Sequence, residues 1–207
     1  MHKFSILSLA LILLFSQSVS ASSLGKHNKK FTPPSKVSKS DWLDASELNR
    51  TWEAALVRVP KANGTYSSYI MGKLFEYSVS TLQPLPTIIY LHGCAGVWAG
   101  TYTRLNFLAK SGFAVIAPVS FARAKYPQSC DPANVKGSMY RGTLNIRQND
   151  AGYAIAKAKQ LNWVDENNIF LMGHSQGGVT TATFKSKDDK MSVNARVIEG
   201  WTCHAGW

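Results

Sequence analysis

The stretch that decides the fold is Ile169-Phe-Leu-Met-Gly-His-Ser-Gln-Gly-Gly178. Its apolar first half is typical of a buried strand, and a segment compatible with a helix follows it. Between the two, Gly173-His-Ser-Gln-Gly177 has the spacing G-x-S-x-G, which in a strand–turn–helix setting places a serine at the tip of a very sharp turn. Glycine is needed on either side because side chains there would collide with neighbouring backbone. The stretch predicts Ser175 as a nucleophile; the alternative is a tight turn with an incidental serine.

A second apolar run, residues 87–91, leads into His92-Gly-Cys-Ala-Gly96. In hydrolases built around a G-x-S-x-G turn, the loop after an earlier strand supplies one backbone N–H group to the oxyanion hole. The residue after the nucleophile supplies the other N–H group. By this logic the backbone amides of Cys94 and Gln176 are the predicted donors.

Strand-like and helix-like segments alternate along the chain. The runs that predict strands are residues 52–59, 69–77, 87–91, 113–119, 169–173 and 195–201. Helical patterns cover residues 102–110 and 141–161, and a polar, proline-containing loop spans about 120–140. An Asn63-Gly64 turn indicates that the first two strands pair antiparallel. This alternation favours an α/β fold, with a mainly parallel sheet covered by helices on both faces.

Several runs taken together carry a family resemblance. They are Leu91-His-Gly-Cys-Ala-Gly96, Phe113-Ala-Val-Ile-Ala-Pro118, and Trp163-Val-Asp165 leading into residues 169–178. Over roughly residues 70–203 the chain resembles the dienelactone hydrolase family of α/β-hydrolases. The resemblance implies an α/β-hydrolase-like fold and a serine hydrolase that cleaves a small-molecule ester or lactone through an acyl-enzyme, without a cofactor. It also implies that an acid and then a histidine follow the nucleophile in the chain.

The segment after Ser175 departs from that pattern. Its one histidine is His204, which comes earlier than the family order implies, directly after the strand beside the nucleophile strand. The acidic candidates are Asp188 and Asp189, in a lysine-rich polar stretch, and Glu199, near the carboxyl end of a strand. His204 and Glu199 are therefore the candidate base and acid within this sequence.

The plainest explanation of this departure is a C-terminal truncation. We then expect the domain, residues 41–207, to lack the last strands and helices of the sheet together with the acid and histidine of the triad. Such a chain is expected to be an impaired enzyme. The alternative is an inactive remnant, or a module with a hydrolase fold that binds a small ligand.

The N-terminal region has two parts. Residues 1–21 combine a basic start, an apolar run and a small-residue cleavage site, which predicts a signal peptide and export to the periplasm or medium. Residues 22–40 are basic and poor in apolar residues, which predicts a flexible leader. The formal net charge is +11. No aromatic-interleaved basic patch accompanies this charge, so we expect no nucleic-acid partner, and no stable membrane anchor is indicated. The oligomeric state is left open.

Three cysteines, Cys94, Cys130 and Cys203, allow three pairings in an exported protein. Because Cys94 lies in the oxyanion loop, we expect a Cys130–Cys203 disulfide. The Cys and His residues lack paired-ligand spacing, so no metal site is expected. Three residues are candidates for contact with substrate: His92, Gly93 and Arg123. The alternatives are that His92 has a structural role and that Arg123 lies on the surface.

Overall fold

A six-stranded mixed sheet runs through the molecule in this computed structural model, which describes residues 30–76, 79, 81 and 83–201. Its strands, in spatial order, are β2 (Tyr66–Ile70), β1 (Leu56–Pro60), β4 (Ala114–Ala117), β3 (Leu85–Leu91), β7 (Val164–His174) and β8 (Ala195–Glu199). The strands β4, β3, β7 and β8 are parallel to one another, while β1 pairs antiparallel with both β2 and β4. A separate two-stranded ribbon pairs β5 (Cys130–Asp131) with β6 (Lys136–Gly137).

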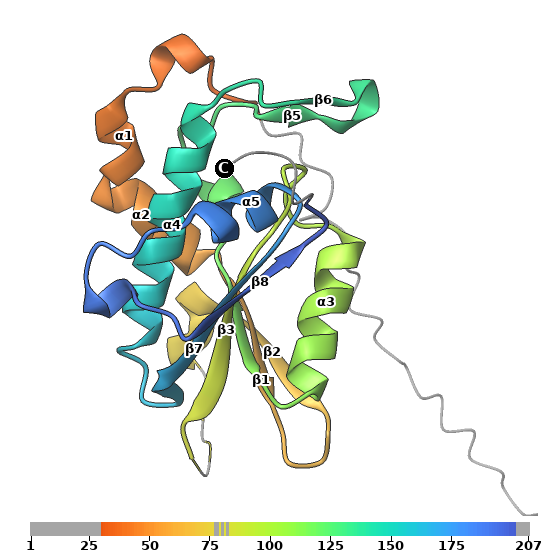
Figure 1. The fold of residues 1–207 in the computed structure, drawn as a ribbon. Helices are drawn as coiled ribbons and strands as arrows, with labels where there is room; N and C mark the ends of the chain where they lie inside the picture. Colours follow the sequence, from red (N-terminus) through yellow and green to blue (C-terminus); the bar gives the residue numbers. More distant parts are fainter. Residues whose placement is uncertain (1–29, 77–78, 80, 82, 202–207) are drawn as a thin grey trace, which may run out of the picture.

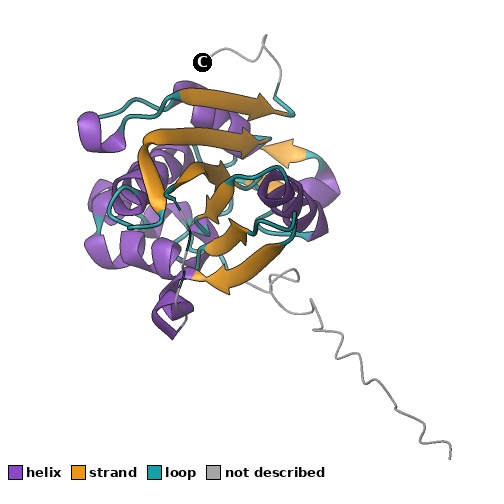
Figure 2. Ribbon diagram, turned by 90° about the horizontal axis from the view of Figure 1, so that it is seen from below, coloured by secondary structure: helices purple, strands orange, loops and turns teal. Residues whose placement is uncertain are grey.

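Helices cover both faces of this sheet (Figures 1 and 2). The α-helices are α1 (Lys39–Leu43), α2 (Ala45–Glu53), α3 (Ala99–Lys110), α4 (Gly142–Ala158) and α5 (Gln176–Thr183). The 3₁₀ turns are η1 (Pro34–Lys36), η2 (Met71–Glu76), η3 (Ser120–Ala122), η4 (Pro132–Asn134) and η5 (Asp189–Met191). In Figure 1, α3 lies on one side of the sheet and α4 and α5 lie on the other. The predicted α/β architecture with a mainly parallel sheet is confirmed.

The core has two apolar layers because the central strand β3 is buried on both sides. Successive side chains of a strand point to opposite faces. Ile88 and Tyr90 accordingly belong to the layer that contains Leu105 of α3. Ile89 and Leu91 belong to the layer against α4. A strand buried on both faces reads as a continuous apolar run, which is what residues 87–91 show.

The first predicted strand, residues 52–59, began too early. Helix α2 extends through Trp52 to Glu53, and β1 starts only after it. The side chain of Asp44 caps this helix by accepting the backbone N–H groups of Ser46 and Glu47. A capping aspartate of this kind stabilises a helix start by about 1 kcal/mol.

The second predicted strand, residues 69–77, was placed too late, because β2 ends at Ile70 and η2 follows. Its antiparallel pairing with β1 is confirmed. The turn between them is also as expected: Gly64 has a φ of 74°, and the backbone N–H of Lys61 donates to the carbonyl oxygen of Thr65 at 2.9 Å.

The folded domain begins before residue 41, which corrects part of the predicted leader. The ring of Phe31 packs edge-on against Phe121, with 5.8 Å between the ring centroids. The backbone N–H of Thr32 donates to the carbonyl oxygen of Tyr126 at 3.0 Å. Residues 1–21, predicted to be a signal peptide, and residues 22–29 lie outside the described residues. Within the described ranges, no helix combines the length and apolarity needed to cross a bilayer.

Candidate active site

Ser175 occupies the turn between the end of β7 and the start of α5. Its backbone has φ 54° and ψ −118°, a left-handed conformation that side-chain-bearing residues rarely adopt. Such a residue costs on the order of 1–3 kcal/mol and persists only where its surroundings hold it. Here the Ser175 N–H donates to the carbonyl oxygen of Glu199 at 2.8 Å, and its carbonyl accepts the N–H of Val179 at 3.1 Å. The sharp turn predicted from the sequence is present.

The glycines on either side of Ser175 are required by close backbone contacts. A Cβ atom added to Gly173 would overlap with the carbonyl oxygen of Gly177. A Cβ atom on Gly177 would overlap with the carbonyl oxygen of Leu91 and would lie 2.8 Å from that of His92. The G-x-S-x-G spacing therefore lets α5 start directly against the end of β3.

The loop 92–96 lies beside the serine turn. A Cβ atom on Gly93 would be 3.6 Å from the Cβ atom of Ser175. Among the described residues, neither the backbone N–H of Cys94 nor that of Gln176 has a hydrogen-bond acceptor. The N–H of Gln176 lies in the first turn of α5, where helix geometry leaves N–H groups without an intrahelical partner. The two predicted donors thus flank one serine.

His92 has a structural role rather than a substrate contact, which corrects its place among the binding candidates. Its side chain is buried, with Nε2 accepting the backbone N–H of Ser120 at 3.2 Å. Because Nε2 accepts, Nδ1 carries the proton and donates to the carbonyl oxygen of Gly93 at 2.7 Å. The ring therefore holds its own loop against η3.

Among the described residues, the carboxylate of Glu199 hydrogen-bonds an arginine. Arg104 of α3 donates from Nε to both carboxylate oxygens, at 2.7 and 2.8 Å. These hydrogen bonds lower the pKa of Glu199, while burial, followed by the charge of Arg104, lowers the pKa of His174. We therefore assign Glu199 to linking β8 with α3, correcting its candidacy as the acid. His204 lies outside the described residues, within which no three His, Cys, Asp or Glu side chains form a metal-binding group.

Arg123 does not reach a pocket mouth, contrary to the expectation from its loop position. Its side chain is 1% exposed, and its Nε and Nη2 donate to Oδ1 of Asp150 at 2.9 and 2.6 Å. It also donates to the backbone carbonyl oxygens of Asp41 and Trp42. Arg123 therefore links α1 to α4 through the carbonyl of Asp41 and the carboxylate of Asp150.

The disulfide joins Cys94 to Cys130, which corrects the expected Cys130–Cys203 pair. The ribbon that starts at Cys130 crosses close to the oxyanion loop, so these two cysteines are adjacent in space. Ser129, the neighbouring residue, accepts a hydrogen bond from Nε2 of Gln176 at 2.9 Å. One short segment therefore holds both predicted oxyanion donors. Cys203 lies outside the described residues.

Breaking this disulfide, by reduction or by C130S, is expected to destabilise the fold. The bond closes a loop with a sequence separation of 36. Chain-entropy arguments assign about 4 kcal/mol to a loop of this size. Thermal unfolding of C130S and of the reduced wild type should show similar losses. C203S serves as the control and should match the wild type; a loss in C203S instead of C130S would contradict the pairing.

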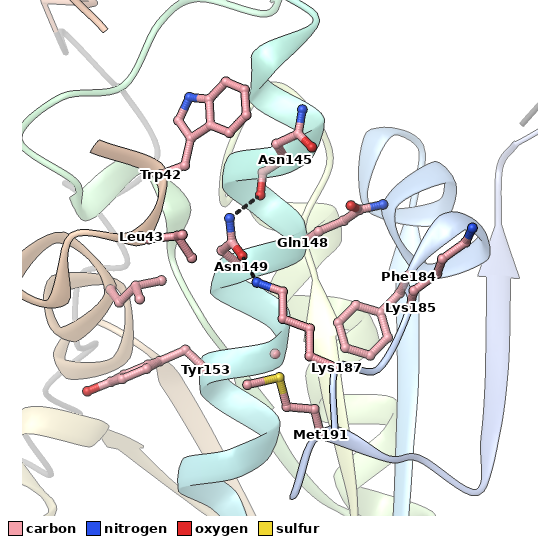
Figure 3. A pocket seen from close by; sticks show the side chains of 12 residues that line it. Trp42, Leu43, Asn145, Gln148, Asn149, Tyr153, Phe184, Lys185, Lys187 and Met191 are labelled. Carbon is pink, nitrogen blue, oxygen red and sulfur yellow. Dashed lines mark hydrogen bonds between the residues drawn. The ribbon is translucent and has the colours of Figure 1, made fainter. Parts of the chain in front are cut away.

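A surface cavity of about 330 Å³ lies away from Ser175, between α1, α2, α4 and the segment after α5 (Figure 3). Asn145, Gln148 and Asn149 of α4 form a polar wall, faced by aromatic and basic side chains such as Phe184 and Lys187. Its lining does not include Ser175, so this cavity is not the site predicted around that serine.

Neither a protein-family model nor a curated protein sequence matches the chain. Several solved structures do match the chain. A dienelactone hydrolase-like promiscuous phosphotriesterase from metagenomic libraries matches at 21% identity, with a TM-score of 0.40, over 61% of this chain and 52% of that one. A provisionally assigned dienelactone hydrolase from Klebsiella pneumoniae matches at 22% identity, with a TM-score of 0.41, over 57% and 49%. An acetyl xylan esterase from Aspergillus awamori matches at 22% identity, with a TM-score of 0.33, over 48% and 35%.

The matches span about half the length of the first two structures. Both of those structures bear the name of the family that the sequence resembles.

Proposed function

We propose that this chain is a serine hydrolase that cleaves an ester or lactone through an acyl-enzyme on Ser175. The observation that carries the proposal is the strained backbone of Ser175, at φ 54° and ψ −118°, between a strand and a helix. Strain of this kind persists in proteins chiefly where function uses it. The N–H groups of Cys94 and Gln176, which have no acceptor among the described residues, also support the proposal.

In the proposed reaction, Oγ of Ser175 forms a bond to the acyl carbon. The carbonyl electron pair moves onto oxygen, where the N–H groups of Cys94 and Gln176 bind the developing negative charge. One such donor contributes on the order of 3 kcal/mol to the transition state. The general base takes the Oγ proton and gives it to the alkoxide that leaves when the intermediate collapses; water then attacks the acyl carbon, which releases the carboxylic acid and returns a proton to Oγ of Ser175. The general base is assigned to a histidine outside the described residues, and His204 is the candidate within this sequence.

The proposal includes export of the protein. The Cys94–Cys130 disulfide supports it, because such bonds form and persist in oxidising compartments. The rival function is capture of a small ligand without catalysis, and the 330 Å³ cavity in Figure 3 is the observation that favours it.

Fluorophosphonate labelling separates the two functions. The probe reacts with an activated serine, so we expect intact-mass detection of one adduct, mapped by peptide digestion to Ser175. S175A should take up no probe while keeping its circular dichroism spectrum. A folded wild-type chain that remains unlabelled would remove the enzyme proposal. H204A then tests the base: unchanged labelling of that variant would dismiss His204.

A further inference from the structure

We infer that Arg147 is a positioning residue for the oxyanion site, an inference that rests on the proposed function. Arg147 lies on α4, and its side chain is 1% exposed. Its Nη2 donates to the carbonyl oxygen of His92 at 2.5 Å, and its Nη1 donates to Oε1 of Gln176 at 3.1 Å. One planar guanidinium therefore joins the two segments that carry the oxyanion donors.

The guanidinium of Arg147 also contacts the peptide group between Gly93 and Cys94, whose N–H is the predicted oxyanion donor of the loop. Nη1 of Arg147 makes a long hydrogen bond, 3.4 Å, to the carbonyl oxygen of Gly93. That oxygen also accepts the Nδ1 proton of His92. The Gly93 carbonyl and the Cys94 N–H belong to one amide, so donors on its oxygen polarise its N–H and strengthen it as a hydrogen-bond donor.

Charge adds to this effect. Within the described part of the chain, Arg147 donates to two backbone carbonyls and one side-chain amide and also interacts with the phenol of Tyr126, and all of these groups are neutral. Arg123, by contrast, is paired directly with the carboxylate of Asp150. The positive charge of Arg147 is thus directed at the loop that would bind an oxyanion, in a buried setting where a charge acts over longer range than in water.

A further contact of Gln176 connects it to the disulfide. Its Nε2 donates to Ser129, whose neighbour Cys130 is bonded to Cys94. Arg147 and the disulfide therefore both hold the segments that carry Cys94 and Gln176. Pre-set donors stabilise a transition state because they need no reorganisation when the charge develops.

The test measures labelling rates at saturating fluorophosphonate, which separate the limiting rate constant kinact from the reversible constant KI. For R147M we expect kinact to fall roughly 10- to 100-fold with KI unchanged, because loss of a whole oxyanion donor costs on the order of 100- to 1,000-fold. R147K keeps the charge but loses the planar fork. It is expected to fold and to lower kinact by a smaller factor.

The matched control is R58M. Arg58 is also buried, on β1, and it donates to Asn106 and to the carbonyl oxygen of Val57. R58M should lose stability without a change in kinact. Equal kinact in the wild type, R147M and R147K would overturn the inference, as would an equal fall in R58M. Should R147M fail to fold, R147K decides by the same comparison. A folded wild type that takes no label would overturn the proposed function and the inference with it.

Discussion

Replacing Gly177 with alanine is expected to lower the free energy of unfolding by more than about 3 kcal/mol. The added methyl group would overlap with the carbonyl oxygen of Leu91, which belongs to the central strand β3. Backbone of a buried strand cannot rotate away as a flexible side chain can. Either α5 moves off the sheet or the turn at Ser175 opens, and both outcomes remove the geometry needed for labelling.

Urea unfolding and fluorophosphonate labelling check this prediction together. G137A is the matched control, since a Cβ atom on Gly137 meets no atom within 4 Å. It should unfold like the wild type. G178A should fall between the two, because its Cβ atom would lie 3.1 Å from the carbonyl oxygen of Glu199. A G177A protein with wild-type stability and labelling would show that α5 does not start against β3.

The D150A variant is expected to destabilise the protein by roughly 3–5 kcal/mol, because it leaves a buried arginine without its counter-charge. Asp150 and Arg123 are each 1% exposed, so water cannot replace the lost partner. Arg123 also donates to the carbonyl oxygens of Asp41 and Trp42, and α1 should therefore loosen with it.

Hydrogen exchange of α1 and urea unfolding measure the two parts of this effect. K125A is the control for loss of an ion pair: Lys125 also pairs with a carboxylate, that of Asp41, but its side chain is 52% exposed. Exposed pairs contribute little, so K125A should unfold close to the wild type. Similar midpoints for D150A and K125A would contradict a buried pair at Asp150.

The sequence predicts those features of this protein that depend on residues close together in the chain. Apolar runs report which segments are buried, and they located all six strands of the sheet, although β7 begins at Val164, ahead of the predicted start at residue 169. Two further differences have local causes: the helix capped by Asp44 extends to Glu53, into the predicted first strand, and η2 follows directly after β2. The turn at Ser175 was predictable because its two glycines and its serine lie within five residues of one another.

The contacts around that turn could not be predicted in the same way. Cys94 pairs with Cys130, Arg123 with Asp150, and Arg147 with the segments at His92 and Gln176. On α4 the sequence signal was a pair of oppositely charged residues, Arg147 and Asp150, three positions apart.

Spacing and residue shape in the local sequence thus specify the strands of the sheet, the helices α3, α4 and α5, and a serine on a strained turn. The partners of Cys94, Arg123 and Arg147 follow only from the tertiary structure. Those partners are distant in the chain and meet only after the strands have packed, and several chemically equal candidates exist for each. The spacing of residues in a sequence indicates which of them are buried, but it does not identify which two will be in contact.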